Sequence, residues 1–342
     1  MKALRLEATG RPLREADVPL PEPGPGEVRV RVRAAGICHS DVHYRAGTSP
    51  VGPLPLTPGH EVAGEVEAVG PGGDASPGDR VALHYLVGCG TCDACREGRD
   101  PWCAEAAMLG KDRDGGYAEA VVVPARNAVP LPGGVGFAEG AVVMCSTSTA
   151  YHALVRARAA EGESVAVFGC GGLGASAIQL AALLGAGRVF GVDVAPARLE
   201  LAGSLGAEAV DAGDGEPSAA LLDATGGRGV DVALELAGSA AATRQAVLSL
   251  APGGRVALAG IHADPVRVWP YRELIGRERE ILGVSDHRLA ELPRLLAWVA
   301  EGRLDLGPVI ERRVPLAAGP VNGVLDELEA GRAAVRTVIE PG

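Results

Sequence analysis

Residues 165–193 read VAVFGCGGLGASAIQLAALLGAGRVFGVD, and this stretch decides the fold of the second half of the chain. A short apolar run at 165–168 is followed by a glycine-rich turn and then by apolar residues at helical spacing up to residue 184. The turn fits G-x-G-x-x-G and consists of Gly169, Cys170, Gly171, Gly172, Leu173 and Gly174. Strand, glycines and helix in this order predict a dinucleotide site, because the glycines let backbone N–H groups at the helix N-terminus approach a pyrophosphate.

Asp193 ends the next apolar run, about 20 residues beyond the glycines, where an acidic residue hydrogen-bonds the adenosine ribose. A carboxylate there repels a 2′-phosphate, so the sequence favours NAD over NADP. Arg198 follows closely and either contacts the adenosine ribose, tolerates a phosphate or is a solvated helix residue. The alternative for the whole motif is a glycine turn that only packs a strand against a helix.

Strand and helix patterns continue to alternate beyond this motif. Together with the run at 165–168, the apolar runs at 188–192, 208–210, 230–236, 255–259 and 280–284 give six strand candidates. Helical stretches separate most of them, which is typical of a doubly wound parallel sheet in an α/β fold. A helix at 290–301 and a strand at 336–339 are expected to close the chain.

The first half of the chain has a different pattern of apolar and charged residues. Residues 27–33 read EVRVRVR, which alternates charge and valine with the period of a strand that has one buried face. Further strands are expected at 60–69, 79–83 and 117–123, separated by clusters of proline and glycine. This pattern predicts an antiparallel, barrel-like domain.

Composition bounds the possible functions. A chain of 342 residues with 47% hydrophobic residues favours two folded domains over a disordered chain. The net charge of −11 disfavours nucleic acid as a partner. Charged residues near the N-terminus argue against a signal peptide, and the lack of a long apolar run argues against a membrane span. We therefore expect a cytoplasmic protein. Two lysines and four side-chain amides fit a thermophile and a GC-rich genome equally well.

Four of the seven cysteines are close in sequence, with the spacing C-x2-C-x2-C-x7-C: Cys89, Cys92, Cys95 and Cys103. Four local thiolates predict a closed tetrahedral site for a structural zinc. Disulfides are disfavoured in a reducing compartment. An iron–sulfur cluster is disfavoured because its bacterial pattern has a shorter final gap and ends in Cys-Pro.

The remaining cysteines are isolated in the sequence. Cys38 opens the stretch CHSDVH at 38–43, and Gly59-His60-Glu61 follows about twenty residues later. Cys145 ends an apolar stretch, where a lone cysteine is usually a small buried hydrophobe, and Cys170 is expected to be structural. Spacing alone does not unite Cys38, His60 and Cys145.

Taken together, these motifs resemble the zinc-containing medium-chain alcohol dehydrogenases over almost the whole chain. The matching stretches, in the expected order, are 36–43, 59–64, 77–81, the four-cysteine lobe, 114–119, 145–151 and the glycine turn. The resemblance implies a GroES-like catalytic domain of residues 1–150 and 286–342, with its zinc lobe at 88–104. A Rossmann domain of residues 151–285 would interrupt it.

The resemblance also implies a second, catalytic zinc, and thus two per chain. Cys38, His60 and Cys145 would hold it and leave the fourth position open for water or alcohol, as in known catalytic zinc sites. Glu61 would lie beside the metal as a transient ligand, or else be a buried carboxylate paired with an arginine. Asp41 would orient His60.

The implied reaction transfers hydride between a primary or secondary alcohol, or its aldehyde or ketone, and NAD. Ser40 would accept the alcohol proton and pass it through the nicotinamide ribose to His43; alternatively, the two are a turn hydroxyl and a surface histidine. Thr149 matches a position near the nicotinamide, and Arg336 matches a pyrophosphate ligand or is a solvated strand end. The expected substrate cleft consists of Tyr85, Ile261, Val284 and Ser285.

Two alternative hypotheses about the function remain open. One is a polyol or amino-alcohol dehydrogenase of the same superfamily, which the third ligand Cys145 disfavours. The other is a non-enzymatic NAD-binding interaction protein, which the intact set of candidate catalytic residues disfavours. Bacterial members of the family are often tetramers, so a homo-oligomer is expected, with a tetramer favoured over a dimer.

Overall fold

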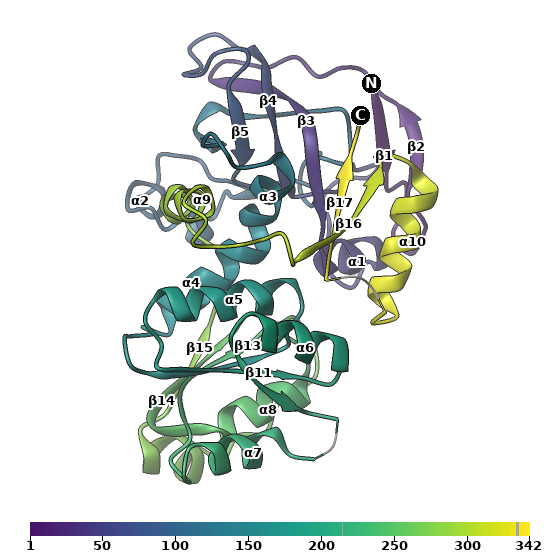
Figure 1. The fold of residues 1–342 in the computed structure, drawn as a ribbon. Helices are drawn as coiled ribbons and strands as arrows, with labels where there is room; N and C mark the ends of the chain where they lie inside the picture. Colours follow the sequence, from purple (N-terminus) through teal and green to yellow (C-terminus); the bar gives the residue numbers. More distant parts are fainter. Residues whose placement is uncertain (214, 333–334) are drawn as a thin grey trace. The chain divides into compact units, whose positions relative to one another are not determined.

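The computed structural model describes residues 1–213, 215–332 and 335–342. They divide into two compact units (Figure 1). Unit 1 consists of Met1–Ser148 and His287–Gly342, and unit 2 consists of Thr149–Asp286. Unit 1 is therefore built from two stretches of chain, and unit 2 from the stretch between them.

Unit 1 is organised around a seven-stranded sheet with the order β16-β17-β3-β4-β5-β9, in which β8 also pairs with β3. Its strands are β3 (Glu27–Ile37), β4 (Glu61–Val69), β5 (Arg80–Leu83), β8 (Ala120–Pro124), β9 (Ala128–Pro130), β16 (Ile310–Pro315) and β17 (Arg336–Glu340). The pairs are antiparallel except β16 with β17. Because β17 pairs with β3, the C-terminal segment is built into the sheet of the N-terminal part.

The sequence pattern of β3 explains its two faces. Val28, Val30 and Val32 are buried in the core of unit 1. The intervening Arg29 and Arg31 both pair with Glu67 of β4, at 3.0 and 2.7 Å. The period-two alternation predicted here is confirmed, because one face packs against apolar side chains and the other carries paired charges.

Short elements complete unit 1. Two small hairpin-like sheets pair β1 (Lys2–Arg5) with β2 (Arg14–Asp17) and β6 (Leu86–Val87) with β7 (Ala107–Met108). The α-helices are α1 (His39–Ala46), α2 (Asp93–Arg96), α3 (Phe137–Val142), α9 (Leu292–Ala300) and α10 (Ala318–Glu329). The π-helical turn η3 (Val143–Thr147) continues α3 into α4 (Ser148–Arg156), and short 3-10 turns are η1 (Asp100–Trp102), η2 (Ala125–Asn127) and η6 (Leu289–Glu291).

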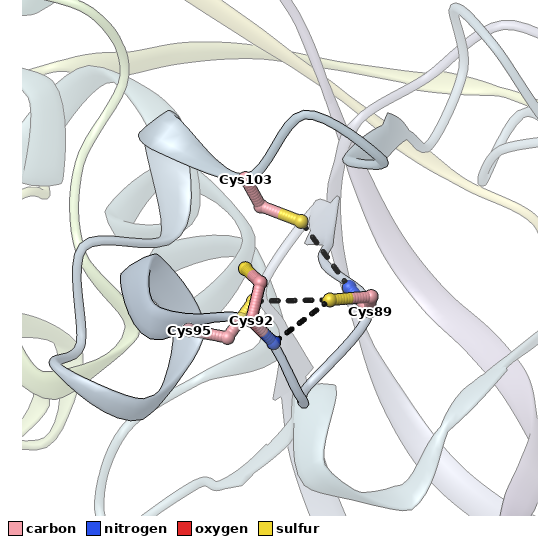
Figure 2. Close-up of side chains that lie close together, drawn as sticks. All are labelled: Cys89, Cys92, Cys95 and Cys103. Carbon is pink, nitrogen blue, oxygen red and sulfur yellow. Dashed lines mark hydrogen bonds between the residues drawn. The ribbon is translucent and has the colours of Figure 1, made fainter.

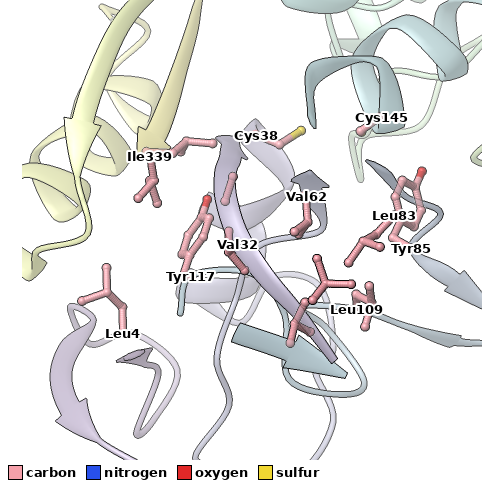
Figure 3. Packing of buried hydrophobic residues seen from close by; sticks show 14 of the residues in the cluster. Leu4, Val32, Cys38, Val62, Leu83, Tyr85, Leu109, Tyr117, Cys145 and Ile339 are labelled. Atoms are coloured by element: carbon pink, nitrogen blue, oxygen red, sulfur yellow. The ribbon is translucent and has the colours of Figure 1, made fainter. Parts of the chain in front are cut away.

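The core of unit 1 packs along β3 and includes side chains of β4 (Figure 3). Apolar side chains from many segments meet there, including Leu4, Leu109 and Ile339. Cys38 and Cys145 belong to the same buried cluster. Two of the predicted metal ligands are thus embedded in apolar surroundings, where an unpaired charge is costly.

Unit 2 contains the six-stranded parallel sheet predicted from the sequence, with the order β12-β11-β10-β13-β14-β15. Its strands are β10 (Ser164–Phe168), β11 (Arg188–Asp193), β12 (Glu208–Asp211), β13 (Val230–Glu235), β14 (Leu250–Leu258) and β15 (Glu280–Gly283). The strand order reverses direction between β10 and β13. In doubly wound sheets, ligands bind at the carboxyl ends of the strands at such a point.

Unit 2 begins within α4, at Thr149. Its further helices are α5 (Gly172–Leu183), α6 (Pro196–Ser204), α7 (Pro217–Ala224) and α8 (Ala240–Leu248), with the turns η4 (Pro270–Leu274) and η5 (Ile275–Arg277) before β15. Helix α5 follows β10 directly through the glycine turn. Among the described residues, no helix is long and apolar enough to cross a membrane.

Some elements differ from the sequence-based expectation. Strand β14 begins at Leu250, five residues before its predicted start at 255. Strands β1, β2 and β16 and the two- or three-residue strands β6, β7 and β9 were not predicted. The reason is that β2 reads READ and has no buried residue, while β16 lies at the edge of its sheet, so its apolar pattern is weak.

Candidate active site

Four side chains of unit 1 form a compact group: one ligand atom from each of Cys38, His60, Glu61 and Cys145 lies within 4.8 Å of the others. All four residues are buried. Cys38 directly follows β3, His60 directly precedes β4, and Cys145 lies in η3. The antiparallel pairing of β3 with β4 places Gly36 opposite Glu61, which brings the first two ligands together.

Asp41, on the first turn of α1, supports this group as predicted for a residue that orients His60. Its Oδ1 lies 3.4 Å from His60 Nδ1. Its Oδ2 accepts hydrogen bonds from the backbone N–H of Cys38, at 2.9 Å, and from the hydroxyl of Tyr117, at 2.8 Å. No role was predicted for Tyr117, because it lies in a matched stretch but is distant from Asp41 in the chain.

The titration of these groups depends on their contacts. The hydrogen bond from Cys145 lowers the pKa of Cys38 far below its usual value, and the same bond raises the pKa of Cys145. Burial by itself lowers the pKa of His60, but Asp41 and Cys38 outweigh it and raise this pKa. One thiolate is thus favoured in a buried space that also contains a second thiol.

The donor set fits a zinc ion. Two sulfurs and one imidazole are a ligand set that zinc uses in catalytic sites, and a divalent cation stabilises both thiolates. His60 Nδ1 and both carboxylate oxygens of Glu61 are buried and make no hydrogen bond, although Asp41 and Arg336 face them as charged neighbours. Buried polar atoms in this condition indicate a site that is completed by a further group.

Glu61 is paired with an arginine. Its Oε1 lies 3.1 Å from Nη1 of Arg336, with side-chain exposures of 0% and 4%. Arg336 also donates to the backbone oxygen of Ile37, at 3.1 Å. Burial raises the pKa of Glu61 to about 7, against the opposing effect of Arg336. The expectation of a carboxylate paired with an arginine is therefore met, within the same group as the candidate metal ligands.

The position of Arg336 tests one of the two predictions made for it. The alternative of a solvated strand end is wrong, because the core of unit 1 buries this side chain at the start of β17. Its guanidinium points to Glu61 and Ile37. The predicted contact with a pyrophosphate stays a prediction.

Ser40 and His43 lie on α1, beside the candidate ligand Cys38. The Oγ of Ser40 is 3.7 Å from Sγ of Cys38. Nδ1 of His43 is 3.1 Å from Oγ1 of Thr48, and its ring lies 5.1 Å from that of His39. Both Ser40 and His43 are half-buried, so the hydroxyl near the metal group and an imidazole within reach of solvent share one helix.

The second cysteine group forms a lobe between β6 and β7 (Figure 2). The sulfurs of Cys89, Cys92, Cys95 and Cys103 lie within 4.8 Å of one another. Cys89 Sγ accepts a hydrogen bond from the backbone N–H of Cys92, and the N–H of Cys89 reaches Cys103 Sγ. The backbone N–H of Thr91 lowers the pKa of Cys89 to about 6, whereas burial raises that of Cys95 to about 12. No disulfide joins any of the seven cysteines.

The glycine turn of unit 2 requires glycine for steric reasons. Gly169 has a φ of +93°, and a Cβ there would lie 2.7 Å from the backbone nitrogen of Ala237. A Cβ on Gly174 would lie 1.9 Å from the oxygen of Gly169. At Gly171, by contrast, the only atom of the described residues within 4 Å of an added Cβ is Nη1 of Arg198, at 3.7 Å. The turn thus has no room for a side chain at Gly169 or Gly174, whereas Arg198 lies near Gly171.

Asp193 is tied to this turn. Its Oδ2 accepts from the N–H of Cys170, at 2.8 Å, and its Oδ1 accepts from the N–H of Ala195, at 2.9 Å. Each carboxylate oxygen has two lone pairs, so these bonds fix the orientation and leave acceptor capacity. Asp193 is therefore bonded to the glycine turn at Cys170, and Arg198 lies near Gly171 of the same turn.

The predicted cleft residues fall in both units. Tyr85 belongs to unit 1, is buried, and its ring lies edge-on to that of His60 with the centroids 5.2 Å apart. Thr149, Ile261, Val284 and Ser285 belong to unit 2. Ile261 is 60% exposed and Ser285 is also exposed, while Thr149 is buried at the start of α4. The cleft roles of Tyr85, Ile261, Val284 and Ser285 stay predictions, as does the predicted position of Thr149 near the nicotinamide.

Comparisons with known proteins agree with this architecture. Residues 24–133 match the family model of the alcohol dehydrogenase GroES-like domain, and residues 172–301 match that of the zinc-binding dehydrogenases. An alcohol dehydrogenase of Geobacillus stearothermophilus is 36% identical, with 99% of both chains covered. An NAD-dependent alcohol dehydrogenase of Sulfurisphaera tokodaii is 32% identical over the full length of both chains.

A solved structure of an NAD-dependent alcohol dehydrogenase has 35% identity, full coverage of both chains and a TM-score of 0.93. Both the resemblance seen in the sequence and the predicted fold class are thereby confirmed. The chain belongs to the zinc-containing medium-chain alcohol dehydrogenase family.

Proposed function

We propose that this protein is an NAD-dependent alcohol dehydrogenase that transfers hydride between a primary or secondary alcohol and NAD. The observation that carries the proposal is the buried group of Cys38, His60 and Cys145, with Glu61 beside it. The names of the relatives support the same activity. The family membership and the acidic residue at the glycine turn support NAD as the cofactor.

In this proposal, Cys38, His60 and Cys145 hold a zinc ion that supplies Lewis acidity toward an alcohol or carbonyl oxygen. The residues of the glycine turn would bind NAD, which would supply the hydride acceptor. Asp41 fixes the ring of His60 and the backbone of Cys38, so the ligands are held before substrate arrives. The apolar core around them excludes water.

Proton movement is assigned to α1. Ser40 lies beside Cys38, so its Oγ is the group that takes the alcohol proton. Ser40 would pass its proton through the nicotinamide ribose to His43, which is half-buried on the same helix and releases the proton to solvent. Glu61 and Arg336 form a buried ion pair next to the ligands, and we propose Glu61 as a transient ligand.

A screen of alcohols tests the proposed function. Purified protein is mixed with NAD and with primary, secondary, aromatic or polyhydroxy alcohols, and the absorbance of the reduced nicotinamide is followed. Simple alcohols should react best. A preference for polyols or amino alcohols would favour the alternative enzyme, and no turnover by zinc-loaded protein would favour a non-enzymatic NAD-binding protein.

We further propose that the four-cysteine lobe holds a second, structural zinc. Replacing Cys103 with alanine should release one of two zincs per chain and lower the melting temperature, because structural zinc contributes directly to folding. Elemental analysis and thermal unfolding measure both effects. Cys170→Ala is the matched control, since Cys170 is also buried but lies outside both cysteine groups; its zinc content should equal that of the wild type.

A single zinc in carefully purified wild-type protein would contradict this assignment. So would a Cys103→Ala variant that keeps both metals.

A separate prediction concerns the choice between NAD and NADP. Asp193 should favour NAD over NADP, because a fixed carboxylate accepts from ribose hydroxyls and repels a 2′-phosphate. Asp193→Gly should lower the ratio of kcat/KM with NAD to kcat/KM with NADP. Arg198 would remain to contact the 2′-phosphate. Wild-type protein that prefers NADP would refute the role of Asp193.

We also propose that the protein forms a homo-oligomer, with a tetramer favoured over a dimer. We place it in the cytoplasm as part of the same proposal. Strand β15 lies at the edge of its sheet, and Ile281 on it is 37% exposed. Nearby in the chain, Tyr271 and Ile275 are 76% and 67% exposed. Exposed apolar residues at a sheet edge support burial against another copy. Light scattering coupled to size exclusion measures the number of copies.

A further inference from the structure

A cluster of three aromatic side chains lies next to the candidate metal ligands in unit 1. His84 and Tyr85 directly follow β5, and His287 is the first residue of the returning segment of unit 1. Their exposures are 1%, 1% and 0%. Neither histidine has a part in the function proposed above.

The two histidines are joined by a hydrogen bond. Nδ1 of His84 lies 3.0 Å from Nε2 of His287, and the ring centroids are 4.9 Å apart. One nitrogen donates and the other accepts, so the bond fixes the orientation of both rings. His84 is thereby attached to a residue that is distant in the chain.

Tyr85 is held between two imidazoles. Its ring stands edge-on to His60, with centroids 5.2 Å apart and an interplanar angle of 84°. It also stands edge-on to His287, at 4.9 Å and 88°. Contact with His287 on one side therefore limits how far the Tyr85 ring can move away from His60 on the other.

The backbone on both sides of this cluster is fixed by other groups. Nδ2 of Asn127 donates to the oxygens of His84 and Leu86, both at 2.8 Å. The oxygen of Tyr85 accepts from the N–H of Leu109, at 3.0 Å. In the returning segment, the N–H of Leu289 donates to Oδ2 of Asp100, at 2.9 Å. Loss of the His287 side chain should consequently remove one contact that limits the Tyr85 ring without releasing either backbone segment, while the stacking of His84 on Tyr85, with centroids 6.0 Å apart, remains.

We infer that His287 is a positioning residue for Tyr85 and thereby sets the size of alcohol that this enzyme accepts. The inference rests on the proposed function. Tyr85 covers one side of His60, so its ring takes up space next to the candidate metal group. Without His287 the ring can turn into the vacated volume and leave more room beside His60.

The test compares His287→Ala, His287→Gln, Tyr85→Ala and the double variant Tyr85→Ala/His287→Ala. The measured quantity is the ratio of kcat/KM for benzyl alcohol to kcat/KM for ethanol. In His287→Ala this ratio should rise about tenfold, the scale of a change in pocket size by a small apolar group. His287→Gln should lie between this variant and the wild type, because glutamine can still hydrogen-bond to His84.

The double variant separates positioning from an independent effect. If His287 acts through Tyr85, its replacement should not alter the ratio once the Tyr85 ring is gone. Trp298→Leu is the matched control, because Trp298 is a buried ring on α9 that stacks with Arg294 and Arg303. It should lower the melting temperature and leave the ratio unchanged.

A second readout does not need activity. The chain has five tyrosines, so protein labelled with 3-fluorotyrosine gives few 19F signals, and Tyr85→Phe assigns that of Tyr85. His287→Ala should shift this signal, and His287→Gln should shift it less. The signal reports the surroundings of the Tyr85 ring even if no alcohol is oxidised.

The outcomes are distinct. If the wild type oxidises no alcohol, the proposed function fails, and the fluorine signal alone decides whether His287 positions Tyr85. If alcohols are oxidised but a folded His287→Ala protein keeps the wild-type ratio, or its effect adds to that of Tyr85→Ala, the inference is overturned. If His287→Ala does not fold, His287→Gln decides by the same ratio and the same signal.

Discussion

Replacing His60 with alanine is expected to abolish alcohol oxidation while the protein remains folded. His60 supplies the only imidazole of the buried metal group among the described residues, and its ring is aligned by Asp41. Loss of this ligand should release the catalytic zinc. Because a Lewis-acid metal contributes several kcal/mol, turnover should fall by about 10³-fold or more.

Elemental analysis, circular dichroism and the rate of NAD reduction together measure this effect. The His60→Ala protein should keep one zinc, in the cysteine lobe, and should retain secondary structure. Cys103→Ala should show the converse pattern, with the metal of the lobe lost. Full turnover by His60→Ala, or retention of both metals, would show that the group of Cys38, His60 and Cys145 is not the catalytic site.

Replacing Ser40 with alanine is expected to lower the rate of alcohol oxidation by about 10² to 10⁴, the range for loss of a proton-transfer group. The Oγ of Ser40 lies 3.7 Å from Sγ of Cys38, so it is near the candidate ligands without being one of them. The zinc content should therefore equal that of the wild type. Ser40→Thr keeps the hydroxyl and is the conservative control.

His43→Ala should have a smaller effect, because water can replace a half-buried imidazole at the solvent end of the path. It should also change the pH dependence of the rate. Rates measured from about pH 6 to about pH 10 test both residues. A Ser40→Ala enzyme with wild-type rates over this range would exclude the relay even if every zinc ligand were correct.

The fold of unit 2 and the local motifs follow from short stretches of sequence. The order of strand, glycine turn and helix at 165–184 is encoded by neighbouring residues, because a Cβ at Gly174 would collide with the backbone oxygen of Gly169. Likewise, the four cysteines of the lobe lie within one short segment, so their spacing alone brings the sulfurs together. Local geometry is what a local pattern can determine.

The candidate catalytic group required long-range structure, and from the sequence only the family resemblance united it. Cys38, His60 and Cys145 are separated by many residues, and their approach depends on the register of β3 with β4 and on the position of η3. A shift of register by one residue would turn every side chain to the opposite face. No spacing rule expresses such a register.

The sequence by itself determined the parallel sheet, the glycine turn, the acidic residue at its edge and the local cysteine group, because neighbouring residues set their geometry. Only the tertiary structure decided that Arg336 is buried against Glu61 and that His287 hydrogen-bonds to His84 and packs against the ring of Tyr85. These contacts join segments from opposite ends of the chain. Their partners are selected by strand pairing and core packing, which depend on the whole of unit 1 and leave no local signature.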